Sequence, residues 1–165
     1  MKRWLWCAVL SVAMAMPAAA DKASKEEMAE FKALVGKVAE AWATLDPAKA
    51  GAYYAKDADL VYFDIAPLKY AGWTEYDKGV RVEFAKFETL KITPNDDLVV
   101  NKHGKIVWTT GTLHMDVKMK GQPGPMGLDA RQTLIWEKRD GKWAIIHEHF
   151  STPMPDAPPP TTSTN

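Results

Sequence analysis

Hydrophobic residues in the first third of the chain recur with the period of a helix. Six of them fall on one face of an α-helix: Phe31, Leu34, Val35, Val38, Trp42 and Leu45. This spacing predicts an amphipathic helix over residues 25–45. The sequence Ser24-Lys-Glu-Glu27 matches a capping box, in which serine and glutamate side chains satisfy free N–H groups of the first turn. We therefore expect the helix to begin just after Ser24.

Two shorter helices and one strand are expected before residue 88. Asp46-Pro47 predicts a second helix that ends near Lys56, because Asp is a favoured N-cap and Pro a favoured first helical residue. Asp57–Asp64 is rich in Val, Tyr and Phe and predicts a strand. Thr74-Glu-Tyr-Asp77 is expected to cap a third helix with an apolar stripe made by Tyr76, Val80, Phe84 and Phe87.

The pattern then changes to strand-like runs separated by Pro, Gly, Asn and Asp clusters. The runs cover residues 89–93, 97–101, 105–119, 128–139 and 142–151. Long adjacent strands with short turns predict a strongly twisted antiparallel sheet. Helices followed by a meander indicate an α+β fold with the helices on one face of the sheet.

The last predicted strand carries apolar residues in both of its alternating rows. Strict alternation puts Trp143, Ile145, His147 and His149 on one face, and Ala144, Ile146, Glu148 and Phe150 on the other. A sheet with one face in water would show one polar row. A second copy of the chain is the simplest cover, so we expect a homodimer formed through the sheet.

The two ends of the chain differ in amino-acid composition from the middle. Residues 1–20 have the positive start, short apolar run and small-residue end of a secretory signal peptide. We expect export to the periplasm or beyond, with no stable membrane insertion after cleavage, since the apolar run is shorter than a membrane span. Residues 153–165 are rich in Pro and Thr and predict a disordered tail. The folded domain is expected to span residues 21–152.

Charge and cysteine content exclude several classes of protein. The chain has 21 basic and 21 acidic residues, and loss of the signal peptide leaves 19 basic residues against 21 acidic. This balance argues against nucleic-acid binding, which needs clustered basic residues. The single cysteine, Cys7, lies within the signal peptide, so the mature domain has neither disulfides nor a catalytic thiol.

A metal site is the first chemistry suggested by the pattern, at His147-Glu148-His149. With Gly141 six residues upstream, the histidines match the start of a cupin metal motif. The carboxylate that completes this motif is missing, because Pro153 and Met154 occupy its place. We therefore expect no metal here, and expect both histidines to hydrogen-bond at the sheet interface or to line a pocket.

Arg131 and Asp64 each have a structural and a functional interpretation. Arg131, on a central strand, is either paired to Asp129 or Glu148 or acts as a clamp for an anion or carbonyl in a cavity. Asp64 follows a strand, where it either caps a turn or faces a cavity as a proton-transfer group.

The C-terminal hairpin resembles a known superfamily. Three features of residues 131–151 carry the resemblance: Arg131-x-Thr133, Gly141-x-Trp143 and His147-x-His149-x-Ser151. Together with the element order, they resemble the nuclear transport factor 2-like superfamily, and within it the SnoaL-like homologues of ketosteroid isomerase. The resemblance implies a curved antiparallel sheet wrapped as a cone around the N-terminal helices, with a cavity at its open end and dimerisation through the sheet.

The resemblance also implies a function, with departures at specific positions. Ketosteroid isomerases use an Asp base with Tyr and protonated Asp donors. Here the base position falls near Tyr62, with Asp64 two residues on, and the second Asp falls near Thr133. The hairpin also resembles the association domain of calcium/calmodulin-dependent protein kinase II, whose pocket arginines are replaced here at about Thr110, Leu134 and Phe150.

These observations give one leading hypothesis and one alternative. The leading hypothesis is a cavity that binds a small, partly apolar organic molecule, with proton-transfer chemistry that needs no cofactor. The expected catalytic residues are Asp64, His147 and His149, and the expected ligand contacts are Arg131, Tyr62, Trp42, Tyr54 and Thr133. The alternative is a non-catalytic module for dimerisation or assembly.

Overall fold

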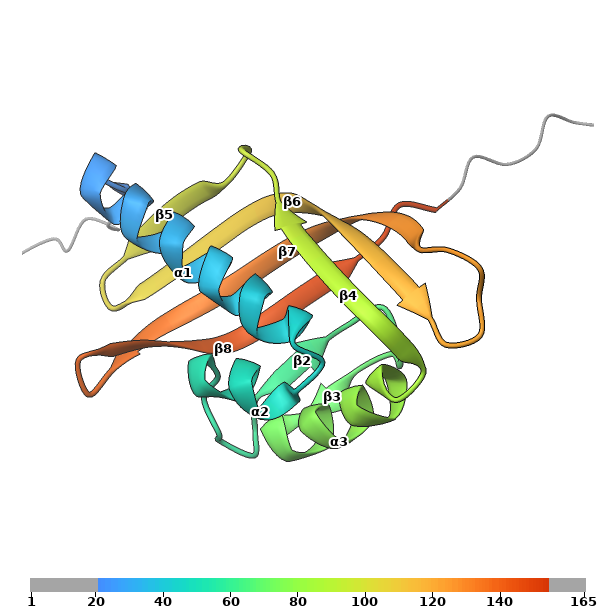
Figure 1. Ribbon diagram of the computed structural model, residues 1–165. Coiled ribbons are helices and arrows are strands. Elements are labelled where there is room, and N and C mark those ends of the chain that lie inside the picture. Colours follow the sequence, from blue (N-terminus) through green and yellow to red (C-terminus); the bar gives the residue numbers. More distant parts are fainter. Residues whose placement is uncertain (1–20, 155–165) are drawn as a thin grey trace, which may run out of the picture.

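A computed structural model describes residues 21–154, in which the helices lie against one side of a strongly curved sheet (Figure 1). The helical elements are α1 (Lys25–Ala43), α2 (Pro47–Ala50), the 3-10 helix η1 (Gly51–Tyr53) and α3 (Gly72–Phe84). The capping box of α1 is confirmed, because the Glu27 N–H donates to Ser24 Oγ at 3.1 Å and the Ser24 N–H to Glu27 Oε2 at 3.0 Å.

Helix α3 begins earlier than the sequence pattern indicates. The prediction that Thr74 caps this helix is wrong, since the helix begins at Gly72 with Ala71 as its N-cap. The Ala71 N–H donates to Glu75 Oε2 at 2.5 Å. The Glu75 carboxylate in the first turn therefore accepts a hydrogen bond from a free N–H group at the start of the helix, the role that was expected of the Thr74 hydroxyl.

The strands of the described region form one sheet. They are β1 (Asp21–Lys22), β2 (Val61–Phe63), β3 (Tyr70–Ala71), β4 (Phe87–Pro94), β5 (Val99–His103), β6 (Ile106–Met119), β7 (Met126–Arg139) and β8 (Lys142–Ser151). Their order is β1-β5-β6-β7-β8-β2-β3, and β4 pairs with β6. Long β6 is thus shared, with β5 on its first half and β4 on its second.

Strands β4 to β8 pair antiparallel as expected, and the sheet is mixed because it also contains one parallel pair. Strand β2 runs parallel to β8, with Tyr62 opposite Glu148 and Phe63 opposite His149. These two strands are far apart in sequence, so no tight turn forces them to be antiparallel. This pairing brings the segment after β2, including Asp64, beside the end of β8.

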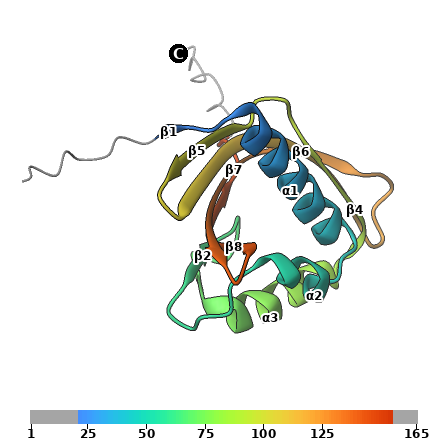
Figure 2. The same ribbon diagram turned by 90° about the vertical axis from the view of Figure 1, so that its left-hand side faces the viewer.

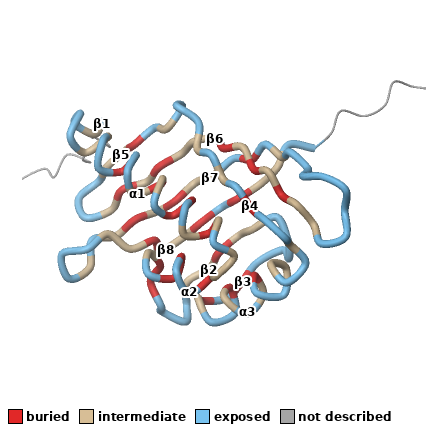
Figure 3. Tube along the Cα trace, in the orientation of Figure 1, coloured by how far each residue is buried: buried red, intermediate tan, exposed pale blue. Residues whose placement is uncertain are grey.

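The sheet curves around α1, as Figure 2 shows from the side. Helix α1 buries Phe31, Val35, Val38 and Trp42 against the concave face, where Trp136 and Ile145 are fully buried. Figure 3 shows buried positions recurring along α1 and along the strands of the sheet. The cone-shaped α+β fold expected from the resemblance is therefore the fold observed.

A β-bulge in β8 changes which residues face the core. His147 pairs with Ile135 but Ile145 pairs with Trp136, so Ile146 has no partner on β7. An extra residue reverses the alternation beyond it. Ile145 and Glu148 therefore face the same, concave side, and both are buried. The prediction that strict alternation holds along this strand is wrong.

The expected signal peptide (residues 1–20) and residues 155–165 of the expected tail lie outside the described residues. Within residues 21–154, helices of the length and hydropathy needed to cross a bilayer are not found.

Candidate functional site

A cavity of about 260 Å³ lies between α1, α3, the segment after β2 and the concave face of the sheet. Its walls are mostly apolar and include Val80, Phe84, Leu113, Met115, Leu128 and Phe150. Ile65 and Met126, which also line it, are 49% and 58% exposed. The cavity therefore leads from the surface into the space between helices and sheet, as small-molecule sites commonly do.

Glu148 forms the polar end of this cavity. Its side chain is only 2% exposed. Oε2 accepts a hydrogen bond from the hydroxyl of Tyr54 and one from that of Tyr76 at 3.3 Å. Oε1 accepts from Gln132 Nε2 at 3.0 Å. These donors are all neutral, so within residues 21–154 the carboxylate has hydrogen bonds but no ion pair.

The pKa of Glu148 is raised to about 7 by this environment. Burial is the main cause, because it disfavours the charged form, and the nearby negative charge of Asp64 adds to it. The hydrogen bonds from Tyr54, Gln132 and Tyr76 act in the opposite direction. A carboxyl group with a pKa near neutrality can both accept and return a proton, as general acid–base catalysis requires.

A cluster of aromatic side chains holds the tyrosine donors in place. The Trp42 indole N–H donates to the Tyr54 hydroxyl at 3.0 Å, so this hydroxyl is left to donate to Glu148. Tyr76 stacks between the rings of Tyr62 and Tyr70, at centroid distances of 5.3 and 4.9 Å. Burial raises the pKa of both donors, Tyr54 and Tyr76, which keeps them protonated.

Asp64 is the second carboxylate that lines the cavity. It is half-buried, and its Oδ1 accepts from the Ile65 N–H at 2.7 Å. Burial raises its pKa, and the charge of Glu83 adds to this effect. Asp64 thus holds the backbone of the next residue and also lines the cavity, and its role in proton transfer stays a prediction.

The structure brings some of the expected site residues together. Trp42 and Asp64 line the cavity. Tyr54 lies behind Glu148 and holds its carboxylate. Tyr62 is fully buried in the aromatic cluster, with its hydroxyl donating to the Ala55 carbonyl at 3.0 Å, and it does not line the cavity.

Four expected site residues lie on the opposite face of the sheet, which corrects their placement. Arg131 and Thr133 alternate with residues of β7 that face the core, and Arg131 and His149 are exposed. Thr133 pairs with His149, and the His147 Nδ1 lies 2.7 Å from the Val61 carbonyl oxygen. The bulge at Ile146 and the alternation of β7 put all four on the convex face, away from the cavity.

Sequence reasoning missed Glu148, Gln132 and Tyr76 as site residues. Gln132 is a single amide in the row of β7 that otherwise holds Ala130, Leu134 and Trp136. Glu148 is likewise a lone charge near apolar residues of β8. A polar residue in an otherwise apolar row of a strand is the sequence feature that could have identified these positions. For Glu148 this feature was not enough, because the sequence pattern does not predict the bulge that turns its side chain to the concave face.

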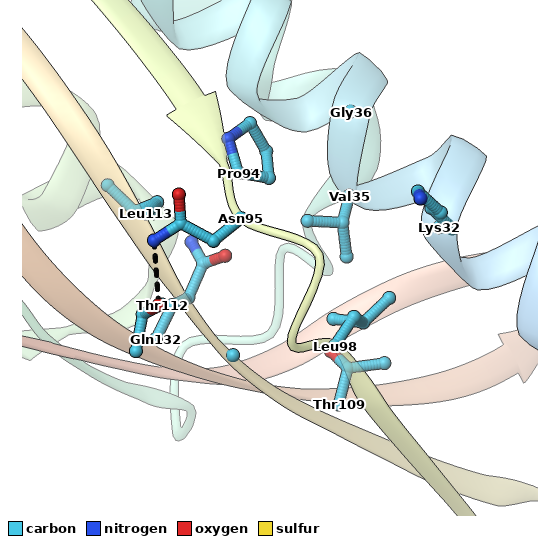
Figure 4. Close-up of a pocket in the computed structure, with 11 residues that line it drawn as sticks. Lys32, Val35, Gly36, Pro94, Asn95, Leu98, Thr109, Thr112, Leu113 and Gln132 are labelled. Atoms are coloured by element: carbon cyan, nitrogen blue, oxygen red, sulfur yellow. Dashed lines mark hydrogen bonds between the residues drawn. The ribbon is translucent and has the colours of Figure 1, made fainter.

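A smaller cavity of about 200 Å³ lies on the other side of Gln132, between α1 and the turn after β4 (Figure 4). Asn95 Nδ2 donates to Thr112 Oγ1 at 2.8 Å across its edge. Lys32, the only ionisable side chain among the described residues that line it, is paired with Asp96 at 2.6 Å. Gln132 lines both cavities, but only the larger one contains carboxylates. Groups of three or more His, Cys, Asp or Glu arranged to hold a metal are not found within residues 21–154.

Several solved structures with this fold are named as nuclear transport factor 2-like proteins. A protein of the nuclear transport factor 2-like superfamily from Salmonella enterica serovar Typhimurium matches with a TM-score of 0.73 at 13% identity, over 87% of this chain and all of that one. A candidate calcium/calmodulin-dependent protein kinase II association domain from Xanthomonas campestris matches with a TM-score of 0.68 at 27% identity, over 83% and 96% of the chains. A candidate scytalone dehydratase from Novosphingobium aromaticivorans matches with a TM-score of 0.69 at 12% identity, over 78% and 85%.

Within this class, a comparison of the sequence with family models identifies the family. The family model for the SnoaL-like domain matches residues 32–155, so the chain belongs to the SnoaL-like family. No curated protein sequence matches the chain.

Proposed function

We propose that this SnoaL-like domain binds a small, largely apolar organic molecule in the 260 Å³ cavity and transfers a proton on it. The observation that carries the proposal is Glu148, a buried carboxylate at an apolar cavity, held by neutral donors with a pKa of about 7. Buried carboxylates with shifted pKa values in clefts are typical of acid–base sites.

The reaction class follows from these groups. Glu148 in its ionised form takes a proton from a C–H beside a carbonyl or similar group, and then returns it to another atom of the same molecule or to a leaving hydroxyl. The first outcome is an isomerisation and the second a dehydration. Asp64, on the same cavity, is the second group that can exchange a proton. The dehydratase-like names of fold relatives agree with this class.

Proton transfer can be tested without knowing the natural substrate. A panel of small apolar ketones and hydroxyketones is incubated with the protein in D₂O, and NMR follows deuterium entry beside the carbonyl. We expect exchange with at least one compound and a loss of 100-fold or more in Glu148→Gln. Glu40→Gln, an exposed glutamate on α1, is the matched control. Equal exchange rates for wild type and Glu148→Gln would exclude Glu148 as the base.

We also propose that the protein is exported and acts as a homodimer. The support for export is the pattern of residues 1–20. The support for the dimer is the convex face, where Trp108, Ile135, His147 and Phe63 form a half-exposed row across β6, β7, β8 and β2. Mass spectrometry of the protein purified from cell fractions tests the export, since the mature chain should begin at Asp21.

An assembly module without catalysis is the second candidate function. The same half-exposed convex row favours it, and so does the name of the relative from Xanthomonas campestris. The two candidates differ in the cavity. An assembly module has no need for a buried carboxylate without an ion pair, because such a group lowers stability. Loss of deuterium exchange in Glu148→Gln with an unchanged oligomer would favour the catalytic function.

A further inference from the structure

The acidic and basic amino acids that line the large cavity within the described region are all carboxylates. They are Asp64, Glu83 and Glu148. Glu83, at the surface, is paired with Lys86 at 2.7 Å. The two deeper carboxylates have no such cation, because Asp64 accepts from a backbone N–H and Glu148 from neutral donors only.

These two carboxylates leave a negative potential inside the cavity. Each unit of charge acts strongly there, because apolar walls screen it far less than water does. The effect is visible in the groups themselves, since the charge of Asp64 raises the pKa of Glu148. An anionic ligand would be repelled by this potential, and a neutral ligand would leave it uncompensated.

The walls of the same cavity suit a positive group on an apolar body. The aromatic side chains of Trp42, Tyr76, Phe84 and Phe150 line the same cavity as the carboxylates. Aromatic faces attract cations through their quadrupole. The outer side of this aromatic cluster already shows such a contact, where the Lys56 ammonium lies 3.6 Å from the ring centroid of Trp73.

We propose that the ligand of this cavity is an apolar molecule with a protonated amine, whose ammonium group lies between Asp64 and Glu148. The cavity defines the site and the carboxylates define the charge of its occupant. The inference rests on the proposed function of the cavity as a ligand site and adds the chemical class of the ligand. A bound ammonium also stabilises the ionised form of Glu148, which is the form that accepts a proton.

Three probes of nearly the same shape test the charge. They are 4-phenylbutylamine, 4-phenylbutanol and 4-phenylbutanoate, titrated into the protein at pH 7 and measured by calorimetry. We expect the amine to bind at least tenfold more tightly than the alcohol, and the carboxylate to bind most weakly. In Asp64→Asn and in Glu148→Gln, the affinity for the amine should fall about tenfold, while that for the alcohol should stay within threefold. Glu40→Gln should leave all three affinities unchanged.

The outcomes separate this inference from the proposed function. If the alcohol binds as tightly as the amine, the inference about charge is wrong. The proton-transfer function of Glu148 is not affected by that result, because the deuterium exchange experiment tests it separately. If Asp64→Asn weakens the amine and the alcohol equally, the charge does not select the ligand and the inference is also wrong. If none of the three probes binds, both the amine inference and the ligand-binding function are contradicted.

Discussion

At the scale of single residues, the central feature is a carboxylate at a place where carboxylates are costly. Glu148 is 2% exposed and has three neutral hydrogen-bond donors. A buried carboxylate without an ion-pair partner lowers the stability of the fold, and such groups are found more often at functional sites than elsewhere in a core. Variants of Glu148 and of the tyrosines that donate to it test this interpretation.

Glu148→Gln should remove a dependence of stability on pH. The pKa of this group is about 7 in the folded state and 4.5 when unperturbed, so the native state binds more protons between these pH values. Its contribution to stability is therefore complete below about pH 4.5 and is lost as the pH rises through 7, by about 3 kcal/mol. Urea denaturation at pH 5 and pH 8 should show a smaller difference in the variant than in wild type or Glu40→Gln. A wild-type difference that persists in Glu148→Gln would contradict the assignment.

Tyr54→Phe should raise the pKa of Glu148 further and destabilise the fold, by about 1–3 kcal/mol. It removes the main donor to the carboxylate and leaves the Trp42 indole N–H unpaired in the core. Tyr76→Phe is the matched comparison, with a smaller expected effect because its bond to Glu148 is 3.3 Å long. A ¹³C NMR titration of the glutamate carboxyl carbons measures both shifts. A larger shift in Tyr76→Phe would reverse the assigned roles.

At the scale of elements, the bulge at Ile146 decides the chemistry of the sheet. Without it, His147 and His149 would face the cavity and Glu148 would face outward, as strict alternation predicts. Bulges often re-aim a side chain next to a functional site. Helix α1 shows the opposite behaviour, since its start and its capping box follow directly from the local sequence.

A glycine on α3 gives a prediction at this scale. A Cβ at Gly79 would lie 2.2 Å from the Tyr70 ring, which packs on Tyr76 in the aromatic cluster. We expect Gly79→Ala to lower stability by about 1–3 kcal/mol, in spite of the better helix propensity of Ala. Gly36→Ala, on α1 with no heavy atom within 4 Å of the added Cβ, should instead raise stability by up to about 1 kcal/mol. Thermal or urea unfolding of the two variants measures this contrast, and equal effects would contradict it.

At the scale of the whole molecule, the curvature of the sheet creates two different faces. The concave face curves around α1 (Figure 2). The cavity lies on this side, while the convex face carries the half-exposed row of Trp108, Ile135, His147 and Phe63. Because the cavity is built within one chain, ligand binding and dimerisation should be separable.

A charge in the convex row should therefore break the proposed dimer without affecting the cavity. Ile135 lies in this row, between Trp108 and His147. We expect Ile135→Arg to be a monomer in analytical ultracentrifugation, with unchanged affinity for 4-phenylbutylamine. The control is Val82→Arg, which replaces an apolar residue that is 60% exposed on α3. A wild-type protein that sediments as a monomer at micromolar concentration would contradict the dimer.

The sequence by itself determined the longer helices and strands and the class of fold. Helical spacing, capping residues and turn clusters are local signals, and they placed α1, the order of helices before strands and the long hairpin of β7 and β8. Resemblance in that hairpin led to the correct family. Asp64 and Trp42 were also recognised as residues that could face a cavity, because they lie close to predicted element ends or faces.

Only the tertiary structure decided which residues share the cavity. The unpaired residue in β8 is a property of its pairing with β7 and has no mark in the local sequence, yet it puts Glu148 inside and the histidines outside. The parallel contact of β2 with β8 joins segments more than eighty residues apart and brings Asp64 near Glu148. Burial then raises the pKa of both carboxyl groups, because the loss of water, which depends on the whole fold, disfavours their charged forms.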